Sequence, residues 1–186
     1  GKYVNTPQTL VFDKSRLVFG LDRARQKIRQ NDLAVLVEGQ MDVIAAHNAG
    51  MDYVVAASGT ALTLEHIKMI KRYTNNISMA FDMDEAGIKA AKRGIDVALE
   101  QGMNIKIIQI PEGYGKDADD CIKKDKDAWF KAVEDAIDVM DWYFAINLDK
   151  KVDLNDPKVK QKAAENILDE IRKIPYAIER EHWRQK

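Results

Sequence analysis

Residues 33–43 read LAVLVEGQMDV, and this segment contains the repeating unit of the predicted fold. Its first six residues are a short, nearly continuous apolar run closed by Glu38, which is typical of a parallel strand buried on both faces. The segment from Met41 to Asn48 then has a helical pattern, and Gly50 is a suitable helix end. A buried strand followed at once by a helix is the repeating unit of α/β proteins.

The same unit recurs along the chain. Apolar runs at 53–57 (YVVAA), 77–81 (ISMAF) and 105–110 (IKIIQI) predict further strands, and helical spacing at 64–73 and 84–101 fills the intervals. Strands separated by single helices predict a parallel sheet with right-handed crossovers. We therefore expect an α/β fold with a central, mainly parallel, four-stranded sheet flanked by helices.

The two ends of the chain are predicted to be helical. A basic helix at 21–30 precedes the first strand, and helices at 128–149 and 157–174 follow the last one. The aromatic side chains of the helix at 128–149, such as Trp129 and Trp142, favour a helical core over a platform for stacking nucleic-acid bases.

Composition limits the class of protein. The chain has 186 residues, of which 46% are hydrophobic, and a formal net charge of −1, which is typical of neither a disordered nor a membrane protein. Cys121 is the single cysteine, so an internal disulfide framework and a multi-cysteine zinc site are excluded within these residues. We expect a soluble cytoplasmic protein with no membrane partner.

The charge is unevenly distributed. Residues 1–30 sum to +5, whereas residues 111–156 sum to −6. This asymmetry has two readings: amphipathic helical ends with an acidic loop, or a phosphate-binding flank beside a cation site.

Acidic side chains follow three of the predicted strands. They are Glu38 and Asp42 after the first strand, Asp82 and Asp84 after the third, and Asp117 and Asp119 in the loop after the fourth. Any one of them is adequately explained as a helix cap. As a set they would repel one another, because two unit charges 4 Å apart repel by about 1 kcal/mol even in water. Oxygen ligands without His or Cys favour Mg²⁺ or Mn²⁺, which in proteins commonly act on phosphates.

The motifs around these acids resemble a known family. VEGQMDV (37–43) and FDMDEAG (81–87) resemble the glutamate and DxD motifs of Toprim domains. Four further motifs extend the resemblance, in order, to bacterial DnaG-type DNA primases: KYVNTP (2–7), FDKSR (12–16), GTALT (59–63) and KDADD (116–120). The sequence departs from the family pattern at Gln40, Met83 and Ala118, where tyrosine, glycine and proline are usual.

This resemblance implies a Toprim fold followed by a C-terminal helical subdomain. Residues 1–30 would be the tail of a basic N-terminal subdomain with its linker, residues 31–133 the Toprim domain, and residues 134–186 a truncated helical subdomain. It also implies a zinc-binding domain and a helicase-binding domain that lie outside this chain.

The implied activity is DNA-directed synthesis of short RNA primers on a single-stranded DNA template, from ribonucleoside triphosphates. Glu38, Asp82 and Asp84 would be catalytic, and with Asp42, Asp117 and Asp119 they would hold Mg²⁺ or Mn²⁺ for two-metal nucleotidyl transfer. The enzyme would act as a monomer at the replication fork, with the replicative helicase as a partner.

Two further groups are candidates for binding the phosphates of the nucleotide or the template. Lys14 and Arg16 are the basic pair nearest the sheet, and their alternative is a solvated basic surface. Ser58, Gly59 and Thr60 would present backbone amides at a helix start, and their alternative is a purely structural turn.

Three other functions are compatible with parts of the pattern. A Toprim-class metal-dependent nuclease would need the same acids but no nucleoside triphosphate. A topoisomerase fragment would need a nucleophilic tyrosine in a separate domain. A non-catalytic core fragment would bind metal and nucleotide without turnover.

Overall fold

The computed structural model describes residues 7, 9, 12–59, 61–82, 85–148, 153 and 155–186, with the side chains of 85 and 86 excepted. The predictions that fall on residues 2–6, Thr60, Met83 and Asp84 lie outside this part of the chain. No helix within the described ranges is long and apolar enough to span a bilayer.

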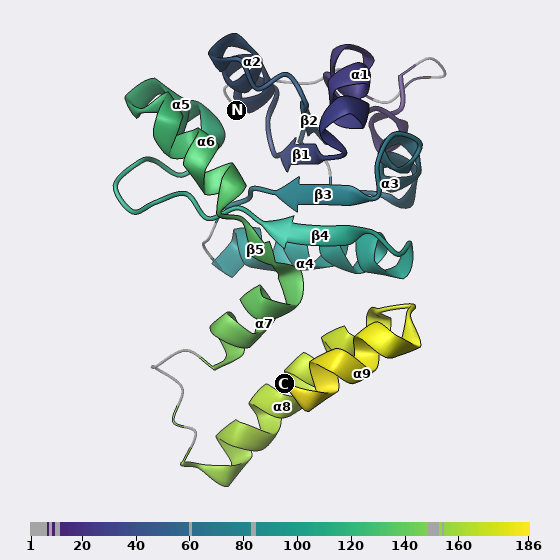
Figure 1. The fold of residues 1–186 in the computed structure, drawn as a ribbon, viewed down its shortest axis with the longest axis vertical. Coiled ribbons are helices and arrows are strands. Elements are labelled where there is room, and N and C mark those ends of the chain that lie inside the picture. Colours follow the sequence, from purple (N-terminus) through teal and green to yellow (C-terminus); the bar gives the residue numbers. More distant parts are fainter. Residues whose placement is uncertain are drawn as a thin grey trace.

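One five-stranded sheet forms the centre of the molecule (Figure 1). Its strands, in spatial order, are β2 (Val54–Ala56), β1 (Ala34–Val37), β3 (Asn76–Met79), β4 (Asn104–Ile107) and β5 (Ile137–Asp138). The first four are mutually parallel, as the apolar runs predict, and the mixed α/β class is confirmed.

The predicted number of four strands is wrong, because β5 adds an antiparallel edge strand. Lys106 and Ile107 of β4 pair with Asp138 and Ile137 of β5. Two residues carry no alternation that a sequence pattern can detect. The continuous helix predicted at 128–149 is therefore interrupted by this strand.

Nine α-helices surround the sheet in the described part of the chain. They are α1 (Leu21–Asn31), α2 (Gln40–Ala49), α3 (Leu64–Lys71), α4 (Glu85–Glu100), α5 (Ala118–Lys124), α6 (Lys126–Glu134), α7 (Val139–Asn147), α8 (Pro157–Lys173) and α9 (Ala177–Gln185). A short 3₁₀ helix, η1 (Lys14–Arg16), precedes α1. Figure 1 shows α7, α8 and α9 as a helical lobe beside the sheet.

Strands β1 and β2 are apolar at every position because helices cover both of their faces, whereas β4 alternates buried apolar residues with exposed polar ones. In β1, Ala34 and Leu36 belong to one core cluster, with helices α1, α3 and α4, whereas Val35 and Val37 belong to the other, with α2, α5 and α6. Successive side chains of a strand point to opposite faces, so a strand covered twice needs no polar residue.

Three aromatic residues of the segment at 128–149 are core residues, as predicted. Trp129, Trp142 and Tyr143 are fully buried. Trp142 lies edge-on to Phe81, the residue before Asp82, with ring centroids 5.5 Å apart. The helical lobe thus packs directly behind the end of β3.

A charged cluster around the buried Glu170 joins the lobe to helix α4. Glu170 of α8 has a side chain only 9% exposed, and one of its carboxylate oxygens accepts a hydrogen bond of 2.8 Å from Lys173. Lys173 also pairs with Asp96 of α4 at 2.7 Å, and Lys92 of α4 lies 3.9 Å from Glu170. These pairs tie α8 to α4.

Replacing Glu170 with alanine is expected to lower the free energy of unfolding by about 2 kcal/mol, measured by urea denaturation. Removing one partner of a buried ion pair typically costs roughly 3–5 kcal/mol. We expect a smaller loss here because Lys173 keeps Asp96 as a partner. The matched control is Asp169→Ala, which breaks a pair with Arg172 whose side chains are 64% and 68% exposed. That variant should stay within about 0.5 kcal/mol of the wild type, and an equal loss in both variants would contradict a role for the buried cluster.

Candidate active site

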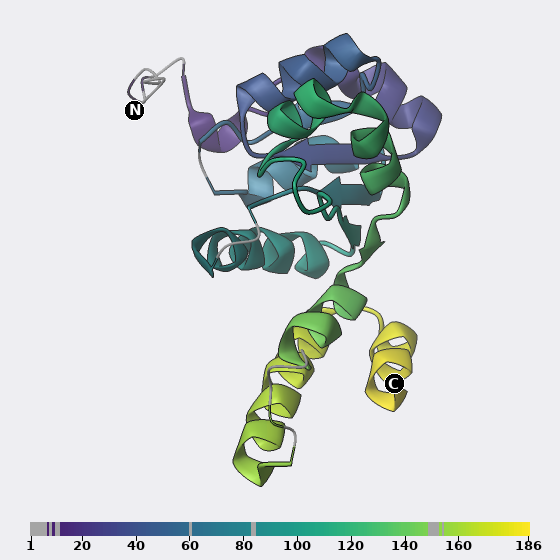
Figure 2. The same ribbon diagram turned by 90° about the vertical axis from the view of Figure 1, so that its left-hand side faces the viewer.

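The carboxyl ends of the parallel strands meet at one edge of the sheet. In Figure 1 the arrowheads of β3 and β4 point to the left, toward the side on which α5 lies, and Figure 2 faces this edge. In open α/β sheets, ligands bind beyond the carboxyl ends of the strands. The segments that follow β1, β3 and β4 carry the predicted acids.

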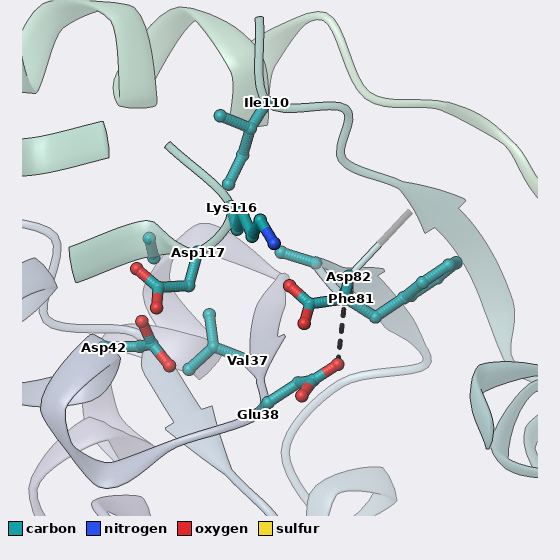
Figure 3. A pocket seen from close by; sticks show the side chains of 10 residues that line it. Val37, Glu38, Asp42, Phe81, Asp82, Ile110, Lys116 and Asp117 are labelled. Carbon is teal, nitrogen blue, oxygen red and sulfur yellow. Dashed lines mark hydrogen bonds between the residues drawn. The ribbon is translucent and has the colours of Figure 1, made fainter. Parts of the chain in front are cut away.

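Four of the predicted acids line one small pocket at this edge. The side chains of Glu38, Asp42, Asp82 and Asp117 border it, together with Lys116 (Figure 3). Its interior measures about 20 Å³, which is room for roughly one water-sized particle. Residues up to 79 positions apart in the sequence therefore meet, as the position of the acids after successive strands predicts.

Glu38 and Asp82 are linked directly. A side-chain oxygen of Glu38 accepts a hydrogen bond of 3.1 Å from the backbone N–H of Asp82, which Figure 3 marks with a dashed line. The link follows from the sheet, because β1 and β3 are parallel neighbours and these residues lie just beyond their carboxyl ends. The carboxylate of Asp82 lies between Glu38 and Asp117 in the same view.

Asp42 is buried and its carboxylate is anchored at both oxygens. One accepts from the N–H of Gly39 and the other from the N–H of Asp119, each at 3.0 Å. Burial raises the pKa of Asp42; the bond from Asp119 opposes the rise and the nearby Asp117 adds to it. Asp42 thus caps α2 and ties α5 to it, and a ligand role for this residue stays a prediction.

Asp117 and Asp119 lie at a helix start rather than in a loop, contrary to the sequence-based expectation. Asp117 is the N-cap of α5 and accepts from the N–H of Asp120 at 2.8 Å. Asp119 lies in the first turn and pairs with Lys123 at 2.6 Å, and this hydrogen bond raises the pKa of Lys123. Only Asp117 of the two lines the pocket.

Lys116 is a site residue that the sequence analysis did not single out. Its ammonium group points into the pocket beside Asp82 in Figure 3. It is the first residue of the KDADD motif, so the signal was present in the sequence. A cation here offsets part of the repulsion among the four carboxylates and suits an anionic ligand such as a phosphate.

The donors at this edge are of the type that a hard cation prefers. All are oxygens, with neither cysteine nor histidine in the pocket lining. Within the described ranges, no three His, Cys, Asp or Glu residues lie close enough together to hold a metal ion as they stand. Asp84, the remaining predicted ligand, is outside those ranges, so its role stays a prediction.

The candidate phosphate-binding residues lie on two segments, η1 and the loop after β2. Lys14 and Arg16 are on η1, which contacts α3. Ser58 and Gly59 do not lie at a helix start, because α3 begins at Leu64 with Thr63 as its N-cap. Gly59 instead lines an apolar pocket of about 300 Å³ next to Glu38. Their phosphate contacts stay predictions.

Known proteins are similar to this chain in sequence and in fold. The family described as Toprim-like matches residues 35–122. A DNA primase of Clostridium acetobutylicum is 36% identical over 179 residues, which are 96% of this chain and 28% of that protein. A DNA primase domain from Pseudomonas aeruginosa superimposes with a TM-score of 0.85 at 34% identity, over 100% of this chain and 58% of that one.

A DnaG primase catalytic domain bound to single-stranded DNA superimposes with a TM-score of 0.84 at 32% identity, over 99% of this chain and 60% of that one. The chain thus spans less than a third of the Clostridium protein and about three fifths of the two solved domains. The motifs at the strand ends, the Toprim match and the similarity over nearly all of its residues agree. The chain belongs to the bacterial DnaG-type DNA primases, of which it forms part of the catalytic core.

Proposed function

We propose that the protein to which this chain belongs synthesises RNA primers on single-stranded DNA. The reaction would join ribonucleotides by attack of a 3′-hydroxyl on an α-phosphate, with release of pyrophosphate. The observation that carries the proposal is the pocket that brings Glu38, Asp82, Asp117 and Lys116 together at the carboxyl edge of the sheet. Carboxylates beside a lysine are the side chains that nucleotidyl transfer needs.

The partners follow from this activity. The template would be single-stranded DNA, in agreement with the DNA that a similar primase domain binds. Ribonucleoside triphosphates would be the substrates and an RNA primer the product. The replicative helicase, a monomeric state, a cytoplasmic location and a zinc-binding domain outside this chain are parts of the same proposal. So is the division at residues 30 and 133 into basic tail, Toprim domain and helical subdomain.

Glu38, Asp82 and Asp84 are the residues that would hold Mg²⁺ or Mn²⁺, with Asp117 and Asp119 completing a second position. Such a cation, when bound, neutralises the charge that develops on the phosphate oxygens. The chain's own contribution is to fix these carboxylates. The N–H of Asp82 orients Glu38, and the cap at Asp117 orients the start of α5. Lys116 would contact the triphosphate.

The test is a primer-synthesis assay with the full-length protein, a single-stranded template and labelled ribonucleotides. We expect short RNA products with Mg²⁺ or Mn²⁺ and their complete loss when EDTA removes the cation. Addition of excess Mg²⁺ should restore them. Cleavage of DNA without nucleotides would support the nuclease alternative, and salt-dependent DNA binding without any product would support a non-catalytic role.

A further inference from the structure

Two side chains at the start of α3 hold η1, which carries Lys14 and Arg16. The hydroxyl of Thr63 donates a hydrogen bond of 2.6 Å to the carbonyl oxygen of Ser15. The ring nitrogen Nε2 of His66 lies 2.7 Å from the carbonyl oxygen of Lys14. Both bonds connect segments about fifty residues apart in the chain, so they are tertiary contacts rather than local turns.

The partners of His66 define its role. Its Nδ1 accepts from the backbone N–H of Thr63 at 3.2 Å, and a carbonyl oxygen such as that of Lys14 can only accept. His66 must therefore be the neutral tautomer with its hydrogen on Nε2, donating to Lys14. The ring is fully buried, and the loss of these bonds would leave buried polar groups without partners.

The same segment borders the carboxylate site. Gly59, Ala61 and Leu62 immediately precede Thr63 and line the apolar pocket that also contains Glu38 and Phe81. The loop after β2 therefore lies next to Glu38 through Gly59, Ala61 and Leu62, and its last residue, Thr63, is hydrogen-bonded to η1. Lys14 is half-buried and Arg16 is exposed, so η1 presents cations to solvent.

We infer that Thr63 and His66 are positioning residues, which fix the backbone of η1 so that Lys14 and Arg16 contact the phosphates of the template or of the nucleotide. The inference rests on the proposed function. The inference gives a role to Thr63, the last residue of the GTALT motif. Thr63 caps α3 and also donates a hydrogen bond to the carbonyl oxygen of Ser15. His66 adds the second bond from the next turn.

The test uses full-length variants that each remove one of the two side-chain hydrogen bonds to η1. Thr63→Val keeps the shape but loses the hydroxyl, and His66→Phe keeps a ring but loses both nitrogens. We expect each to weaken single-stranded DNA binding, or to raise the KM for ribonucleotides, by about fivefold, the usual effect of losing the one hydrogen bond that each side chain makes to η1. Binding measured over several salt concentrations identifies template contacts through a shallower salt dependence, and the KM identifies nucleotide contacts.

Matched controls separate positioning from stability. Thr74→Val removes a buried hydroxyl that donates to Asp32 at 2.7 Å, at the opposite edge of the sheet. His47→Phe removes a ring nitrogen that lies 2.9 Å from the carbonyl oxygen of Val54. These controls should lose comparable thermal stability but keep wild-type affinities, and Thr63→Ser should restore binding.

The decisive comparison combines the variants. Adding Thr63→Val to a Lys14→Ala, Arg16→Ala background should weaken binding no further, because the groups being positioned are already gone. Wild-type affinity and KM in both Thr63→Val and His66→Phe, or additive losses in the combined variant, would overturn the inference. Failure of the proposed function would appear separately, as absence of primers from the wild type, since DNA binding is measured without synthesis.

Discussion

Replacing Asp82 with alanine is expected to reduce primer synthesis by at least about a thousandfold, which corresponds to roughly 4 kcal/mol of transition-state stabilisation. The carboxylate of Asp82 lines the pocket and lies between Glu38 and Asp117 in Figure 3. Alanine removes this carboxylate but keeps the backbone N–H that donates to Glu38. The variant therefore tests the charged group while leaving the connection between β1 and β3 in place.

The measurement is a primer gel at saturating ribonucleotides, with Mn²⁺ affinity determined in parallel by calorimetry. Asp82→Asn should lose about as much activity as Asp82→Ala, since the charge rather than the shape is needed. Both should bind Mn²⁺ more weakly and unfold at the wild-type temperature. Asp169→Asn is the control, because it removes an exposed aspartate remote from the pocket. More than about a tenth of wild-type activity in Asp82→Ala would remove this residue from the site.

Replacing Gly87 with alanine should be nearly as damaging, with a loss of activity of about a hundredfold or more. A Cβ atom at this position would lie 2.2 Å from the carbonyl oxygen of Asp82 and 2.8 Å from its Cβ. Neither atom is the end of a flexible side chain, so the backbone between β3 and α4 must shift. A displacement of about 1 Å in a catalytic group commonly costs about a hundredfold in rate.

The matched control is Gly50→Ala, which separates a steric clash from backbone strain. Gly50 has a φ of +103°, and an added Cβ would meet nothing within 4 Å. We expect this variant to lose about 1 kcal/mol of stability, because alanine is strained at positive φ, and to keep its activity. Gly87→Ala should instead lose activity in excess of any loss of stability. A fully active Gly87→Ala enzyme would show that the turn after β3 tolerates displacement.

Local patterns predicted most of the fold. The apolar runs at 33–38, 53–57, 77–81 and 105–110 each overlap a strand of the sheet, and the continuous apolar character of the run at 33–38 predicted burial on both faces, which β1 has. All four residues of β1 are apolar because helices cover the strand on both sides, whereas the polar Lys106 of β4 is exposed. The strand at Ile137–Asp138 lacks this signal, because its pairing depends on where the chain returns to β4.

The sequence predicted which acids meet at the candidate site, but only part of how their side chains are arranged. Glu38, Asp42, Asp82 and Asp117 meet because parallel strands place their carboxyl ends at one edge. Asp119 has the same charge and nearly the same position in the chain. It nevertheless pairs with Lys123, because one helical turn carries its side chain in that direction. Lys116 was missed although it begins the KDADD motif, and His66 was missed because an isolated histidine has no periodicity of its own.

The amino-acid sequence was enough to predict the four parallel strands, most of the helices, and the gathering of acids at the carboxyl edge. Those properties are encoded locally, in the spacing of apolar residues and the residue that ends each run. Only the tertiary structure decided that both oxygens of Asp42 accept backbone hydrogen bonds, that Lys116 faces Asp82, and that His66 holds the carbonyl of Lys14. These contacts join segments distant in sequence, and their geometry is set by how helices pack on the finished sheet.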